Sequence, residues 1–339
     1  MALQSKREEL EAAWRALAGI QAEESWRTIP IDICGPCRLL AGRHFPGNEE
    51  ALLVGFASIR IPPTEQLPQG LGFQVSKVEL GVDGLGLSWI ALCRQRAGNP
   101  DFFAMMADDI VVTLEKQPMN DDVRLFNIFI SRIKAWQDFM RKGGGDILSP
   151  EAEIGLFGEL IFLHKLLDSD LLAEFVVDSW QGPLDGIHDF VFGTGAIEVK
   201  STVSPHGFPA KVASLDQLDD SLIRPLFLAA IRLELNPMGK SLPILIRETK
   251  DLLNSNLIAL ACLNSRLLHA GYFDAFADRY TRRFLQIGCR LMVVNDDFPR
   301  LTRANVALAI RDARYEIDLD LVSLGDVEII DVLNQLGVV

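Results

Sequence analysis

Long apolar runs are missing from this chain of 339 residues. No stretch of about eighteen apolar residues, the length that begins to span a membrane, occurs in it. The segment MALQSKREELEAAWRALAG at the start predicts an amphipathic helix with charges throughout, and it lacks the apolar centre of a secretory signal. We therefore expect no membrane segment and no export, and we expect a cytoplasmic location.

Cysteine is also scarce, with five residues in the whole chain. Cys34 and Cys37 enclose a Cys-Gly-Pro-Cys sequence that resembles the redox motif of thioredoxins. That motif needs a preceding βαβ unit and a helix that begins at the first cysteine, whereas only one predicted helix and a short segment precede it here. Pro36 is more typical of a turn beside two reduced thiols. The other cysteines do not complete a zinc-binding set.

Phosphate-binding loops and serine nucleophile motifs are absent as well. Gly239-Lys240-Ser241 resembles the end of a phosphate-binding loop, but the glycine that the pattern requires is Glu234. Asn236-Pro237 predicts a turn at this point instead. These observations exclude an ATPase. The five histidines are scattered, and only His188 adjoins other candidate chemistry.

Basic residues are too few for a protein that coats nucleic acid by bulk electrostatics. The chain has 33 Lys and Arg against 46 Asp and Glu, a net charge of −13. The window from 271 to 314 departs from this balance, because its eight arginines outnumber its five aspartates. This window predicts either a local basic groove or a solvated helix face, and the sequence does not decide between them.

A run of three glycines, Gly143 to Gly145, marks the clearest boundary in the chain. Residues 1–118 predict a smaller β-rich N-terminal domain behind the leading helix. Residues 119–145 predict a connecting helix, whose apolar side chains recur at helical spacing, followed by the glycine linker. Residues 146–339 predict a second domain with a helical C-terminal extension. The expected strands of the first domain are 53–62, 72–80 and 86–94 within a β-rich region from 28 to 115.

The second domain begins with Ser149-Pro150, an N-cap followed by proline at the first helical position. A helix over 151–169 should follow it. Strands and helices then alternate irregularly, which predicts an α/β (α+β) fold with a mixed sheet flanked by helices. The expected strands are 174–180, 188–192, 196–202, 226–235, 289–294 and 313–322, and the later helices are 242–255 and 256–270.

Three charged residues interrupt the strand-forming segment HDFVFGTGAIEVKST, residues 188–202. A two-residue turn at Gly193-Thr194 would place Asp189 directly opposite Glu198. Glu198 and Lys200 are two residues apart and share one face of a strand, and directly opposed residues share that face too. Asp189, Glu198 and Lys200 should therefore project from one side of a hairpin, while apolar residues fill the other side.

Two carboxylates this close repel each other unless a cation lies between them. Oxygen ligands from two acids, completed by water, suit Mg²⁺. Such an ion activates bound water and neutralises charge on a phosphodiester, while Lys200 can orient the water or stabilise charge that develops on phosphorus. The alternative is a structural salt bridge on an exposed hairpin, since the bare D-x₈-E-x-K pattern occurs often by chance.

Glu159 lies in the preceding helix, in an apolar segment with Gly155 and Gly158. Glycine inside a helix costs about 0.5–1 kcal/mol relative to alanine, so it usually serves a close approach. Gly155 and Glu159 are four residues apart and share a helix face. We expect both glycines to lie where this helix packs against the sheet and Glu159 to reach the charged cluster. The alternative is a solvent-exposed glutamate.

A helix with a glutamate, followed by a three-stranded meander with Asp189 and Glu198-Val199-Lys200, resembles the PD-(D/E)XK nuclease superfamily, which has the restriction-endonuclease-like fold. The ordered segments GLFGELIFL, Trp180, HDF, EVKST, SLDQL and FPRLTRAN are similar to the PD-(D/E)XK motif proteins of bacterial phage-defence islands. This resemblance covers residues from about 120 to about 320. The chain has His188 where the motif has proline, a replacement that is common in the superfamily.

The resemblance implies a Mg²⁺-dependent DNA endonuclease in restriction or phage defence, with Mn²⁺ as a substitute ion. It implies that Asp189 and Glu198 are metal ligands, Lys200 is the catalytic lysine, and Glu159 is an accessory ligand or an orienting group. Gln217 in SLDQL would contact the metal-bound water or the phosphate, or it is a polar surface residue. The implied partners are DNA and other defence-operon proteins such as an ATPase. Because cutting both strands of a duplex generally requires two active sites, we also expect a homodimer.

Two other classes of function stay open at this point. One is a non-catalytic DNA-binding or assembly subunit of a defence complex, although an intact Asp-Glu-Lys set favours the enzyme. The other is a thioredoxin-like oxidoreductase, which would require the Cys-Gly-Pro-Cys segment to be exposed at a helix N-terminus.

Overall fold

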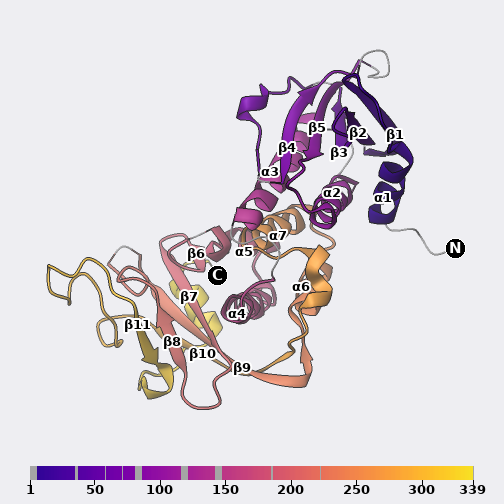
Figure 1. Ribbon diagram of the computed structural model, residues 1–339. Coiled ribbons are helices and arrows are strands. Elements are labelled where there is room, and N and C mark those ends of the chain that lie inside the picture. Colours follow the sequence, from indigo (N-terminus) through magenta and orange to yellow (C-terminus); the bar gives the residue numbers. More distant parts are fainter. Residues whose placement is uncertain are drawn as a thin grey trace. The chain divides into compact units, whose positions relative to one another are not determined.

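The chain divides into two compact units, residues 1–146 and residues 147–339 (Figure 1). The computed structural model describes residues 6–34, 37–57, 59–70, 72–80, 86–115, 121–141, 147–184, 186–221 and 223–338. The glycine run at 143–145 lies outside these ranges. Within the described ranges, no helix is both long enough and apolar enough to cross a membrane.

The first unit is a five-stranded antiparallel sheet with helices on one face. The strand order is β1-β2-β3-β5-β4. The strands are β1 (Ser25–Cys34), β2 (Cys37–Phe45), β3 (Glu49–Phe56), β4 (Phe73–Val78) and β5 (Ser88–Arg94), and the helices are α1 (Lys6–Leu17), α2 (Pro100–Glu115) and α3 (Asp122–Arg141). Trp14 of α1 donates a hydrogen bond to the carbonyl of Ala51 in β3 (2.9 Å), which fastens the helix to the sheet.

Residues 100–115 form helix α2, so the prediction of a β-rich region up to residue 115 is wrong. Phe103, Met106 and Ile110 are buried at helical spacing along this segment. The expected strands 72–80 and 86–94 correspond to β4 and β5, and the connecting helix corresponds to α3. The expected strand 53–62 overlaps β3 only at residues 53–56.

The Cys-Gly-Pro-Cys segment joins two antiparallel strands. Cys34 ends β1, Cys37 begins β2, and the two residues are partners in the ladder. Gly35 and Pro36 lie outside the described residues. Because no helix begins at the first cysteine, the segment lacks the feature that lowers the pKa of a thioredoxin-type thiol. The oxidoreductase hypothesis loses its structural basis here.

The second unit is a mixed α/β unit around a four-stranded sheet of order β10-β9-β7-β6. Strands β7 and β9 are parallel, and the other two pairs are antiparallel. The strands are β6 (Phe190–Phe192), β7 (Gly195–Thr202), β9 (Leu226–Lys240) and β10 (Phe284–Val293), with a separate pair β8 (Pro209–Val212) and β11 (Tyr315–Asp318). The helices are α4 (Pro150–Leu167), α5 (Ala173–Ser179), α6 (Leu242–Leu252), α7 (Leu257–His269) and α8 (Ile329–Gln335).

Helix α4 packs on one face of this sheet against β7 and β9 (Figure 1). It begins as the sequence predicts, because Ser149 accepts a hydrogen bond from the Ala152 N–H (3.2 Å) and Pro150 takes the first helical position. The other face holds a second core, in which Leu228 and Ala230 of β9 pack with Ala210 and Val212 of β8. The sheet is therefore covered on both faces.

Three predictions for the second unit are wrong. Residues 174–179 of the expected strand 174–180 belong to helix α5, which contacts α4 and α7 and buries Val176 and Val177. Asn236-Pro237 does not make a turn, since β9 continues to Lys240, and Pro237 lies beyond the last residue paired with β10. The hairpin β6–β7 is joined by the parallel strand β9, so the strands do not form a three-stranded meander.

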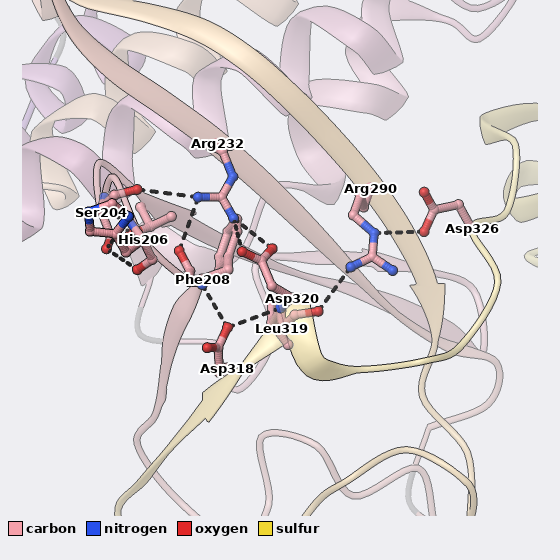
Figure 2. A network of polar contacts seen from close by, with 11 residues as sticks. Ser204, His206, Phe208, Arg232, Arg290, Asp318, Leu319, Asp320 and Asp326 are labelled. Atoms are coloured by element: carbon pink, nitrogen blue, oxygen red, sulfur yellow. Dashed lines mark hydrogen bonds and ion pairs between the residues drawn. The ribbon is translucent and has the colours of Figure 1, made fainter.

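Arginines on β9 and β10 fasten the C-terminal segment to the sheet (Figure 2). Arg232 of β9 donates to both carboxylate oxygens of Asp320 (2.6 and 2.7 Å) and to the carbonyls of Ser204 and Gly207. Arg290 of β10 donates to Asp326 (2.9 Å) and to the carbonyl of Leu319 (2.9 Å). These bonds hold the loop that follows β7 beside the segment around β11.

Four of the eight arginines in the window from 271 to 314 are paired with acids. Arg300 contacts Asp220 (2.8 Å), and Arg303 contacts Asp216 (2.7 Å). Arg282 pairs with the buried Glu153 of α4, and Arg290 pairs with Asp326. At these four positions the positive charge is used within the unit, so they do not form a free basic groove.

Candidate active site

The hairpin β6–β7 gathers the charged residues of the segment 188–202. Phe190 pairs with Ile197 and Phe192 with Gly195, which leaves a two-residue turn. Gly193 in that turn has φ of 56°, the left-handed conformation that such turns require of their first residue. This register brings Asp189, immediately before β6, opposite Glu198.

Next to the first residue of β6, the Asp189 side chain accepts a backbone hydrogen bond from β7 that a paired strand would otherwise accept. Its Oδ2 accepts a hydrogen bond from the Val199 N–H of β7 (2.7 Å). Its own carbonyl accepts from the N–H groups of Gln181 (2.7 Å) and Gly182 (3.1 Å). The carboxylate is thus held at the point where the β7 edge loses its partner strand.

Glu198 is the most deeply buried acid of the cluster, with 2% of its surface exposed. Its Oε1 accepts from Lys200 Nζ (2.8 Å) and from Gln217 Nε2 (2.6 Å). Its Oε2 is buried and has no hydrogen-bond partner among the described residues. Because buried carboxylate oxygens are nearly always satisfied, this oxygen is available to a ligand.

Glu159 of α4 reaches the same place around the open edge of β7. Trp180 Nε1 donates to Glu159 Oε2 (2.7 Å). A Cβ added at Gly182 would lie 2.7 Å from Asp189 Oδ1 and 2.8 Å from Glu159 Oε2. The absence of a side chain at Gly182 therefore leaves room for the two carboxylates to lie on either side of this point.

Only one of the two helix glycines lies at a close approach. A Cβ at Gly158 would fall 1.7 Å from Ser201 Oγ of β7, so α4 and the sheet meet there. A Cβ at Gly155 would have no described atom within 4 Å, so the expected close approach at Gly155 is wrong. Gly155 lies one turn before Glu159, and that turn of the helix faces open space at this position.

Burial dominates the electrostatics of the three acids. The pKa of Glu198 is raised to about 8, first by burial and then by the charge of Asp189, while Lys200 opposes the change. Burial also raises the pKa of Asp189 to about 6, against a hydrogen bond from Val199 and the charge of Lys200. The pKa of Glu159 lies well above its usual range because of burial and then the charge of Asp189. Without a cation, the cluster therefore retains protons near neutral pH.

Gln217 lies inside the cluster rather than on a solvated surface. Its amide group spans from Glu198 to the backbone, because its Oε1 accepts from the Ala213 N–H (2.9 Å) while its Nε2 donates to Glu198. His188 supports the same loop through a hydrogen bond to the backbone of Gln217, and burial lowers the pKa of His188. The Nε2 atom of His188 is buried without a described partner.

The donor set suits a hard divalent cation. Asp189 and Glu198 offer carboxylate oxygens, one of them without a partner, which are the ligands that Mg²⁺ prefers. No group of three or more His, Cys, Asp or Glu side chains within the described ranges is arranged to hold a metal. Mg²⁺ is usually bound by one or two carboxylates with water and substrate phosphates, so a two-acid site is sufficient.

The sequence did not reveal the roles of Trp180, Gly182 and His188. Trp180 holds Glu159, Gly182 leaves space between two acids, and His188 supports the Gln217 loop. The bridge between Trp180 and Phe190 brings the first two beside Asp189. The spacing of Trp180 and Gly182 in the sequence does not by itself indicate an active site. Their role becomes visible only because the bridge to Phe190 places them beside Asp189.

Comparison with known proteins gives one family. A family model with the description "Putative PD-(D/E)XK family member, (DUF4420)" matches residues 10–320. The match spans both compact units and includes all the residues of the cluster. No curated protein and no solved structure matches the chain.

Proposed function

The chain belongs to this family of PD-(D/E)XK members, and from that premise we propose that it is a metal-dependent DNA endonuclease that hydrolyses phosphodiester bonds. The family supports a nuclease-like function. The proposal goes further in naming DNA as the substrate, internal cleavage as the reaction, and Mg²⁺ or Mn²⁺ as the ion.

One observation carries the proposal. Glu198 is buried beside Asp189, has one oxygen bound to Lys200 and Gln217, and has the other oxygen free of partners among the described residues. A plain salt bridge would place Glu198 and Lys200 together without a second acid. Burying two acids side by side costs free energy in the metal-free protein, and a cation repays that cost.

Each residue has a definite part in this mechanism. Asp189 and Glu198 would hold the cation, which when bound lowers the pKa of water and neutralises charge on the phosphodiester. Lys200 Nζ lies beside Glu198 Oε1. From this position its ammonium group can hydrogen-bond to the attacking water or to a phosphate oxygen that gains negative charge in the transition state. Gln217 keeps Glu198 Oε1 engaged, so that Oε2 is the oxygen left for the cation.

Glu159 adjusts the protonation of the site in this proposal. Trp180 donates to its Oε2, so a proton retained by this carboxyl would sit on Oε1. The raised pKa of Glu159 means that it can hold a proton while Asp189 is ionised, which relieves repulsion between the two acids. We therefore assign Glu159 an orienting and proton-holding part rather than a direct ligand position.

The biological setting proposed is restriction or phage defence. The resemblance to proteins of defence islands supports it, and the same resemblance supports partners from the same operon. Action as a homodimer is proposed on a separate argument. A homodimer supplies two active sites, one for each strand of a duplex.

Plasmid cleavage tests the proposed activity. The wild-type chain should nick or cut plasmid DNA with Mg²⁺ or Mn²⁺, and Lys200→Ala should lose cleavage while keeping its folding and DNA affinity. Asp189→Ala should also lose metal binding, measured by calorimetry. Lys134→Ala changes an exposed lysine of α3 and should cut like the wild type. If all four preparations cut equally, a contaminating nuclease is responsible, and if none cuts with either ion, a non-catalytic DNA-binding subunit becomes the better explanation.

A further inference from the structure

The sheet of the first unit has a hollow on the face opposite α1 and α2. Its volume is about 780 Å³, within the range of small-ligand sites. Leu39 and Ala41 of β2 point toward the helices and are fully buried. The hollow extends from Thr28 of β1 to Ser76 of β4, and residues at the ends of β4 and β5 also line it.

An aromatic pair forms one end of the hollow. Trp26 and His44 are direct cross-strand partners, and their rings lie 4.7 Å apart between centroids. The ring nitrogens of His44 each face a carboxylate, Glu24 at 3.7 Å and Glu49 at 3.8 Å. The two ring planes are inclined by 35°, and carboxylate oxygens lie at the edge of this aromatic surface.

Glu49 has an unused acceptor in this hollow. Its Oε2 is buried and makes no hydrogen bond to any described residue. The neighbouring Cys93 cannot supply a charge, because burial and then the charge of Glu49 raise its pKa to about 12. A ligand that stacks on the rings and donates an N–H group would satisfy this oxygen.

Basic residues line the opposite part of the hollow. Lys77 of β4 and Arg96 after β5 are both exposed, and neither has an ion-pair partner in the described part of the chain. Arg94 differs, since Glu50 neutralises it at 2.6 Å. Neighbouring strands lie about 4.8 Å apart, so the five strands span roughly 19 Å, the length of a few nucleotides.

We propose that this hollow binds an unpaired nucleobase of a DNA strand, with the adjoining phosphates against Lys77 and Arg96. The base stacks on the ring of Trp26, beside His44, and its exocyclic amino group donates to Glu49. The proposal rests on the proposed function only in taking DNA as the nucleic acid. A separate contact is useful because residues 147–339 contain 17 Lys and Arg against 27 Asp and Glu, so bulk attraction does not bring DNA to the active-site unit.

Fluorescence anisotropy of the full chain tests this site. The probes are labelled single strands of about ten nucleotides, a length typical of single-strand sites, made of adenine, cytosine or thymine alone. Lys200→Ala protein in EDTA prevents cleavage during the measurement. Adenine and cytosine strands should bind more tightly than thymine strands, because thymine lacks the amino group. A perfect duplex and a duplex with one unpaired cytosine distinguish a single-strand site from a site for an extruded base.

Matched variants identify the residues responsible. Trp26→Ala should weaken binding about tenfold or more, the loss of one base–aromatic stack, whereas Trp26→Phe should restore most of it. Glu49→Gln should remove the preference for cytosine over thymine. Glu23→Gln, which changes an exposed glutamate outside the hollow, should bind like the parent protein. Circular dichroism of every variant checks that the sheet is intact.

The outcomes separate this site from the nuclease proposal. Strand binding that is insensitive to both Trp26→Ala and Glu49→Gln overturns the site, whether or not the wild type cuts DNA. Absence of any strand binding at micromolar protein, or tight binding of a lysine-rich peptide in its place, also overturns it. If the wild type never cuts DNA but its binding of single-stranded DNA responds to these variants, the result supports the site and refutes only the proposed nuclease activity.

Discussion

Replacing Glu198 by glutamine should stabilise the metal-free protein at alkaline pH. In the folded chain the pKa of Glu198 is raised from 4.5 to about 8, first by burial and then by the charge of Asp189. A raised pKa means that the folded state holds the proton more tightly than the unfolded chain does. Its stabilising contribution is therefore complete below the unfolded value and is lost as the pH rises through about 8.

The size of this effect follows from the difference between the two pKa values. At about 1.4 kcal/mol per pH unit, it amounts to a few kcal/mol, and to about 5 kcal/mol at most. Glutamine has nearly the same shape and cannot ionise. The free energy of unfolding of Glu198→Gln should therefore fall less steeply with pH between about 5 and about 8 than that of the wild type. Some fall should remain in the variant, because burial also raises the pKa values of Asp189 and Glu159.

Urea unfolding in EDTA at a series of pH values measures the difference, with circular dichroism as the signal. Glu234→Gln is the matched control, since Glu234 is exposed on β9. In a second series Mg²⁺ should restore the stability of the wild type at alkaline pH but should leave Glu198→Gln unchanged. Parallel pH curves for Glu198→Gln and the wild type would refute the buried-acid argument, and equal stabilisation of both by Mg²⁺ would refute the assignment of Glu198 as a ligand.

Further expectations concern the helix contact, the approach of the acids and assembly. Gly155→Ala should stabilise the protein by about 0.5–1 kcal/mol in thermal unfolding, whereas Gly158→Ala should destabilise it by about 1–3 kcal/mol, and equal effects would contradict the packing of α4. Gly182→Ala should lower Mg²⁺ affinity in calorimetry, because its Cβ would push apart two acids; unchanged affinity would remove Gly182 from the site. Gln217→Ala should raise the Mg²⁺ concentration needed for half-maximal cleavage, and an unchanged requirement would reduce Gln217 to a structural residue. Light scattering with DNA present should find a dimer, and a monomer at micromolar concentration would count against a homodimer.

The sequence predicted the hairpin of the site in detail, because the pairing of β6 and β7 depends only on residues that are close together in the chain. Strand residues alternate between two faces, and a two-residue turn leaves one register for the flanking strands. The position of Asp189 opposite Glu198, with Lys200 on the same face, follows from these two rules. The start of α4 at Ser149-Pro150 was equally local, since capping depends on the few residues around it.

Residues that meet across the fold were predicted less well. Val176 and Val177 favour a strand by propensity, yet they form part of α5 because their burial against other helices outweighs that preference. Gly155 and Gly158 are alike in the sequence, and only the path of β7 beneath α4 shows that Gly158 is the one in contact. The window 271–314 predicted either a basic groove or a solvated helix face, and neither prediction included the acids, far away in sequence, that pair with Arg282, Arg300 and Arg303.

The sequence by itself determined which residues could carry chemistry: a pair of acids and a lysine on one hairpin face, and a glutamate on the helix before it. The tertiary structure decided the environment of these residues. Glu198 is buried, with Gln217 bound to one carboxylate oxygen and no described partner on the other. Trp180 holds Glu159, and Gly182 leaves space between Glu159 and Asp189. The physical reason is that residue spacing fixes direction within one element, whereas desolvation and pKa values depend on everything packed around a side chain.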